Sequence, residues 1–190
     1  MADLVAVVGS VTPPGRLRQA MGHLVEVAAA RPGATARLLD LADHRLSFAD
    51  GRPLEALHDD SALVVEALAR ADAVVLASPV YRGSFTGALK NLLDLAPVDA
   101  LRGKPVGIVA MGATLHHYLG VDGQLRQVLA WFGALVAPTS VYLESAHFAE
   151  GRLADPSARA AIEALVATLF ELTGHAGAKL GPPPLASGRG

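Results

Sequence analysis

The chain has 190 residues, of which 52% are hydrophobic, so it is long enough for one well-buried domain and short for two. It contains no cysteine, which excludes disulfides, thiolate nucleophiles, iron–sulfur clusters and cysteine-bound zinc, so any redox chemistry must come from a bound cofactor. The net charge is -2 and the 16 basic residues are scattered, so we expect neither a nucleic-acid partner nor a membrane surface.

The N-terminus leads directly into a short apolar segment without a basic region. No apolar run in the chain approaches the length of about 18 residues that a membrane span needs. We therefore expect no signal peptide and a cytoplasmic location.

Five short apolar runs, rich in Val, Leu and Ala, predict strands that are buried on both faces. They are residues 4–8, 36–41, 73–77, 106–110 and 134–142. Apolar residues at spacings of three and four predict the intervening helices, over residues 16–30, 61–71, 87–96, 119–133 and 156–172. Strands that alternate with helices of this length pair in parallel through right-handed crossovers, so the sequence predicts a doubly wound α/β fold.

Two segments depart from this alternation. Residues 42–59 mix histidine, arginine and proline with scattered apolar residues, which indicates an irregular excursion within the domain. Residues 174–190 are rich in Gly, Pro and small residues and predict a flexible tail. Residues 1–173 are therefore expected to form a single domain.

The junction between the first strand and the first helix, residues 9–18, combines hydroxyl groups, backbone amides and two arginines. A helix N-terminus attracts anions through its unpaired N–H groups and partial positive charge. The segment lacks the Gly-Lys-Ser/Thr of a Walker loop and the Gly-x-Gly-x-x-Gly of a dinucleotide site. It therefore predicts a monophosphate site, with a solvated loop and its capping residues as the alternative.

A second junction, residues 77–94, leads from a buried strand through Pro79, Val80 and Tyr81 to a helix that begins near Gly87. Open α/β sheets bind flat cofactors at such a point, where backbone groups face the polar edge of a heterocycle. The alternative for this segment alone is an ordinary strand-to-helix turn with Tyr81 half buried.

A third junction, Gly112, Ala113 and Thr114, follows the predicted strand 106–110. Small residues there allow a ligand to approach the backbone, so we expect them to flank the same ligand as the second junction. His116 and His117 are adjacent and diverge, and no third ligand follows at a zinc-like spacing, so we expect no metal site.

The helices that contain residues 89–96 and 119–131 carry more apolar surface than one small domain readily covers. Association buries such surfaces. We therefore expect a homodimer or homotetramer.

Taken together, three motifs resemble the NADPH-dependent FMN reductase family, and most of all the reductase components of two-component alkanesulfonate monooxygenases. They are Gly9-Ser10 with its proline-rich loop, Ser78-Pro79-Val80-Tyr81 with Gly87-Ala88-Leu89-Lys90-Asn91-Leu92-Leu93-Asp94, and Gly112-Ala113-Thr114 with Val121-Asp122-Gly123-Gln124-Leu125. The resemblance spans residues 4–145. It implies a flavodoxin-like fold with a five-stranded parallel sheet in the order 2-1-3-4-5.

The resemblance also implies an enzyme, an NAD(P)H:FMN oxidoreductase in which NADPH passes a hydride to FMN N5 without a catalytic protein acid or base. The residues expected at the phosphate are Ser10, Thr12, Arg16, Leu17 and Arg18. Those expected at the ribityl chain and the isoalloxazine are Pro79, Val80, Tyr81, Arg82, Gly112, Ala113 and Thr114. The partner implied is a flavin-dependent monooxygenase that receives reduced FMN.

The sequence departs from the family pattern at three positions. Thr12 stands where an arginine is expected and Gly15 where a serine is common. Gly123 replaces a bulky Tyr or His that accompanies a π-type bulge and release of the flavin as a product. Two alternatives therefore stay open: a quinone, azo-dye or chromate reductase that retains its FMN, and a flavodoxin-like electron carrier that does not react with nicotinamide.

Overall fold

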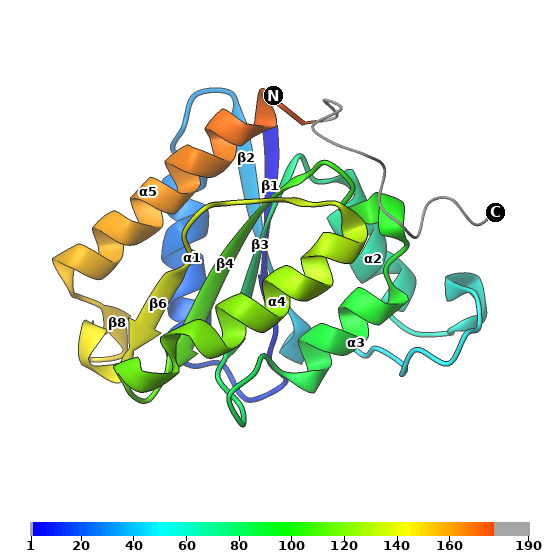
Figure 1. The fold of residues 1–190 in the computed structure, drawn as a ribbon, viewed down its shortest axis with the longest axis horizontal. Helices are drawn as coiled ribbons and strands as arrows, with labels where there is room; N and C mark the ends of the chain where they lie inside the picture. The colour runs from blue at the N-terminus through cyan, green and yellow to red at the C-terminus, as the bar shows by residue number, and fades with distance from the viewer. Residues whose placement is uncertain (1, 177–190) are drawn as a thin grey trace.

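The fold is seen in a computed structural model that describes residues 2–176. A parallel sheet lies between two layers of helices, with the strand order β2-β1-β3-β4-β5 and with β6 also paired to β4 (Figure 1). The strands are β1 (Ala2–Val8), β2 (Ala34–Asp40), β3 (Ala73–Pro79), β4 (Pro105–Gly112), β5 (Leu135–Val136) and β6 (Val141–Glu144). The flavodoxin-like strand order predicted from the sequence is therefore confirmed.

Helices cover both faces of the sheet, which explains why its central strands β1, β3 and β4 are buried along most of their length without polar alternation. α1 (Arg16–Ala29) and α5 (Pro156–Thr173) pack on one face, while α2 (Ser61–Arg70), α3 (Gly87–Leu95) and α4 (Tyr118–Phe132) pack on the other. Each face has its own hydrophobic core. The central strands β1 and β3 contribute to both cores, and they hold the loops that follow them.

The predicted fifth strand, residues 134–142, is wrong as a single element. The structure divides it into β5 and β6, which pair with different parts of β4: Val136 aligns with Val106, and Val141 with Val109. The interruption contains Pro138, which has no N–H to donate to a ladder.

The sequence prediction also missed a small antiparallel hairpin between β6 and α5. It is formed by β7 (Phe148–Ala149) and β8 (Arg152–Leu153) and turns through Glu150 and Gly151, both with positive φ. The Gln19 side chain of α1 accepts a hydrogen bond from the Leu153 N–H at 2.7 Å, so the hairpin is bonded to the first helix.

The last described helix is α5. α5 ends at Thr173 and a turn follows to Ala176. The rest of the predicted tail, residues 177–190, lies outside the described residues, and the domain boundary stays a prediction. Within residues 2–176 no helix has the length and apolar character required to cross a membrane.

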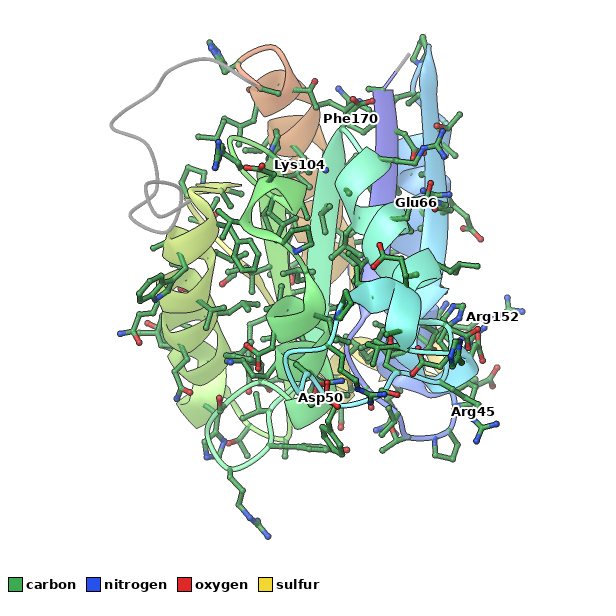
Figure 2. The ribbon with its side chains drawn as sticks, turned by 90° about the vertical axis from the view of Figure 1, so that its right-hand side faces the viewer. Arg45, Asp50, Glu66, Lys104, Arg152 and Phe170 are labelled. Atoms are coloured by element: carbon green, nitrogen blue, oxygen red, sulfur yellow. The ribbon has the colours of Figure 1, made fainter. Side chains whose placement is uncertain are left out.

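The two ends of the sheet differ in what they carry. Figure 2 shows Lys104 and Phe170 at one end and Arg45, Asp50 and Arg152 at the other. Lys104 directly precedes β4, so the end of the sheet where it lies holds the amino ends of the strands. The Lys104 ammonium caps α2 by donating to the Leu68 and Ala69 carbonyls. Burial lowers the pKa of Lys104 to about 8. The loops that form the candidate site lie at the opposite, carboxyl end.

Candidate functional site

A cavity of about 220 Å³ opens at the carboxyl ends of β1, β3 and β4. After β1 the chain continues to β2 on one side, whereas β3 and β4 lie on the other, so the cavity occupies the point where the strand order reverses. Open α/β sheets bind their ligands there. The lining residues are Val8, Ser10, Thr12, Pro13, Pro14, Gly15, Arg16, Leu17, Arg18, Asp40, Pro79, Tyr81 and Met111.

The N-terminus of α1 forms one wall of this cavity. Its N-cap is Gly15, in extended conformation, and its first turn contains no acidic residue, so no side chain of its own caps the first amide groups. Across the loop, the Ser10 and Thr12 hydroxyl groups lie 2.8 Å apart, and Ser10 Oγ accepts from the Thr12 N–H at 3.3 Å. Amides and hydroxyls that converge in this way suit an anion.

The two arginines of the first turn have different environments. Arg18 Nη1 donates to Asp40 and Asp43 at 2.8 and 2.7 Å, and its hydrogen bond to Asp43, with that to Asp40, raises the pKa of the guanidinium. Asp40 is buried, so Arg18 neutralises a carboxylate that would otherwise repel an anion.

Arg16 instead donates to the neutral Ser145 Oγ at 3.0 Å. No carboxylate lies within ion-pair distance of Arg16 among residues 2–176. Arg16 is therefore the cation at this cavity whose charge remains available to a ligand.

A buried hydroxyl network joins the first loop to the second. Thr86 caps α3 by accepting from the Leu89 N–H, and its hydroxyl donates to the Gly9 carbonyl. Ser78 Oγ accepts from the Thr86 N–H at 3.0 Å and donates to the Pro79 carbonyl at 2.9 Å. Both hydroxyl side chains are buried, so they fix the spacing between the loop after β1 and the loop after β3.

After Pro79 the chain forms a two-residue hairpin. Tyr81 and Ser84 exchange backbone hydrogen bonds of 2.8 and 3.0 Å, while Arg82 and Gly83 occupy the turn with φ of 53° and 75°. Two consecutive positive φ values are typical of a type I′ turn. Tyr81 is half exposed and lines both the main cavity and a second hollow of about 370 Å³, bounded by Val80, Tyr81 and Arg82.

The third junction is organised by Tyr142, which the sequence prediction missed. Its hydroxyl donates to the Thr114 carbonyl at 2.6 Å, and burial raises the pKa of the phenol, with a further contribution from Glu144. A side chain at Gly112 would overlap this hydroxyl. The protein itself thus occupies the space that the sequence argument reserved for a ligand at Gly112, and the ring contact of Gly112, Ala113 and Thr114 stays a prediction.

The structure brings most of the predicted residues to one place. Ser10, Thr12, Arg16, Leu17, Arg18, Pro79 and Tyr81 line the main cavity, and Val80 and Arg82 line the adjoining hollow. Met111, rather than the following glycine, lines the cavity from β4, and Asp40 enters from the end of β2. Asp40 had a detectable signal, because it is an acidic residue near the carboxyl end of the predicted strand 36–41.

Known proteins resemble this chain in sequence and in fold. The profile of the family described as NADPH-dependent FMN reductase matches residues 2–148. The chain belongs to the NADPH-dependent FMN reductase family. An NAD(P)H-dependent FAD/FMN reductase of Geobacillus thermodenitrificans is 44% identical over 137 residues, which are 72% of this chain and 74% of that protein.

A second relative, the NADH-dependent FMN reductase SfnF of Pseudomonas putida, is 32% identical over 167 residues, covering 87% of this chain and 90% of that protein. Among solved structures, an apo NADH:FMN oxidoreductase (EMOB) superposes with a TM-score of 0.76 at 23% identity, covering 100% of this chain and 97% of that one. Family membership confirms the predicted class, an NAD(P)H-dependent FMN oxidoreductase.

Proposed function

We propose that this chain reduces FMN with NAD(P)H at the carboxyl end of its sheet, in the cytoplasm, and supplies the reduced flavin to a flavin-dependent monooxygenase. The observation that carries the assignment of the site is the cavity where the uncapped N-terminus of α1 meets the ends of β1 and β3. Family membership supports the reaction class.

The residues of the cavity suit a flavin monophosphate. The first-turn amides of α1, the hydroxyls of Ser10 and Thr12 and the guanidinium of Arg16 would hold the phosphate, while Arg18 keeps Asp40 neutralised. Arg45, Asp50 and Arg152 lie at the same end of the molecule (Figure 2). Pro79 and Tyr81 line the part of the cavity farther along the sheet, which suits the ring system.

When bound, FMN supplies the hydride acceptor, and the reaction requires no proton donor from the protein. The side chains therefore bind and orient. Thr86 and Ser78 fix the phosphate loop against the ring loop, and Tyr81 presents its ring at the entrance.

One observation favours a second candidate function, a reductase that retains its FMN. Gly123 lies within α4, which is regular α-helix from Tyr118 to Phe132 with no π-type turn. A side chain at Gly123 would project into open space, so the glycine is not imposed by packing. In the sulfonate-type reductases a bulky residue at this position accompanies flavin release, and purification with bound yellow flavin would support retention here.

We also propose that the chain associates as a homodimer or homotetramer through α4. Its residues Leu119 and Trp131 are 56% and 63% exposed, whereas the apolar residues of α3, Leu89, Leu92 and Leu93, are buried in the domain's own core. Trp131→Glu should lower the mass measured by light scattering at micromolar concentration while leaving the fold intact. A wild-type protein that is already monomeric would contradict this assignment.

Equilibrium binding of FMN and riboflavin tests the proposed site. Loss of the phosphate contacts should weaken binding by several kcal/mol, because hydrogen bonds to a charged group contribute about 1.5–3 kcal/mol each. Equal affinities for the two flavins would contradict a phosphate site at α1.

A further inference from the structure

Helix α4 is attached to the Tyr81–Ser84 hairpin through one glutamine. Gln124 Nε2 donates to the Gly83 carbonyl at 3.1 Å, and Gln124 Oε1 accepts from the Ser84 hydroxyl at 2.5 Å. Both ends of this side-chain amide are thus used by the same hairpin, although Gln124 is exposed.

The backbone of α4 also approaches the hairpin directly. A Cβ atom placed on Gly120 would lie 2.6 Å from the Gly83 carbonyl oxygen, so only glycine allows the helix to come this close. Gly120 and Gln124 are one helical turn apart and therefore lie on the same face of α4. Together they form a second support for the hairpin, whose other support is the Val80 N–H bonded to the Met111 carbonyl at 2.8 Å.

The hairpin needs such support because its turn is unfavourable for one of its residues. Arg82 has a positive φ without being glycine, a conformation that surrounding contacts must maintain. The same hairpin carries Tyr81, which lines the main cavity. A change in the position of the turn would therefore move the Tyr81 ring relative to the cavity.

We propose that Gln124 is a positioning residue that holds the Tyr81 hairpin at the ring side of the flavin site, with Gly120 permitting the approach. This inference rests on the proposed function. It assigns the affinity for the phosphate to α1 and the affinity for the ring to α4. Gln124 contacts the hairpin and not the cavity, so its effect on the flavin passes through Tyr81.

The test compares dissociation constants for FMN and riboflavin in the full-length protein, measured by quenching of flavin fluorescence. Gln124→Ala should weaken the binding of both flavins by about 3- to 10-fold, as expected for the loss of one or two ordinary hydrogen bonds. The ratio of the two dissociation constants should stay unchanged. The matched control is Gln127→Ala on the same helix, because Gln127 is exposed and its side chain makes no hydrogen bond within residues 2–176. It should bind both flavins as the wild type does.

Ser84→Ala and Gly120→Ala provide independent variants. Ser84→Ala removes only the hydroxyl contact to Gln124 and should have a smaller effect of the same kind, whereas Gly120→Ala should push the Gly83 carbonyl, and with it the hairpin, away from α4. If Gln124→Ala is too unstable to assay, the affinities of Ser84→Ala for FMN and riboflavin test the same inference.

Two results would overturn the inference: affinities for both flavins within twofold of wild type in Gln124→Ala, or a changed ratio of FMN to riboflavin affinity. A changed ratio would mean that Gln124 acts on the phosphate loop. Failure of the wild type to bind either flavin would instead overturn the proposed function, so the two failures are distinguishable.

Discussion

The two halves of the proposed cofactor site, one for the phosphate and one for the ring, are built in different ways. The phosphate half consists of neighbours in sequence: Ser10, Thr12 and the first turn of α1. The ring half depends on contacts between distant segments, such as Gly83 with Gln124 and Gly112 with Tyr142. In the first half, amides, hydroxyls and the Arg16 guanidinium would meet the phosphate directly, whereas in the second half side chains fix the backbone, so substitutions should affect the two halves differently.

The largest effect on this comparison is expected from Arg16→Ala. Arg16 is the arginine of the first turn that no carboxylate neutralises within residues 2–176. Its loss should weaken FMN binding by about 10-fold or more, because a hydrogen bond to a charged group contributes about 1.5–3 kcal/mol. Riboflavin, which has no phosphate, should bind as before. Titration of both flavins measures the ratio, with Arg152→Ala as the control for charge at the same end of the molecule.

A change at Gly112 should act on the fold before it acts on the ligand. Gly112→Ala places a methyl group against the Tyr142 hydroxyl and should destabilise the protein by about 1–3 kcal/mol, as overpacking does. Urea unfolding measures this loss. Adding Tyr142→Phe should recover part of it, whereas an unchanged midpoint in Gly112→Ala would show that the space beside Gly112 is open.

The smallest effect is expected at Tyr81. Tyr81→Ala should weaken FMN and riboflavin equally, by about 0.5–1.5 kcal/mol if the ring packs on the flavin. The side chain is half exposed, so the melting temperature should change little. A loss confined to FMN would assign Tyr81 to the phosphate half and break the division proposed here.

The sequence predicted features that depend on neighbouring residues and missed those that depend on contacts between distant segments. Strand and helix positions and the strand order came from local patterns and from motifs in order along the chain, and the anion site at α1 stays a prediction. The break between β5 and β6 was missed because Pro138 sits inside an apolar run that otherwise indicates one strand. Tyr142 and Gln124 act across 28 and 41 positions of the chain, and no local pattern indicates such contacts.

The central claim, that this chain transfers reducing equivalents from NAD(P)H to FMN, is tested most directly by anaerobic titration of the protein with NADPH in the presence and absence of added FMN. With FMN, each equivalent of NADPH should bleach the visible absorbance of one flavin, at a rate far above that of FMN and NADPH without protein. Tight binding of FMN with no bleaching by either NADPH or NADH would contradict the account and assign the fold to an electron carrier.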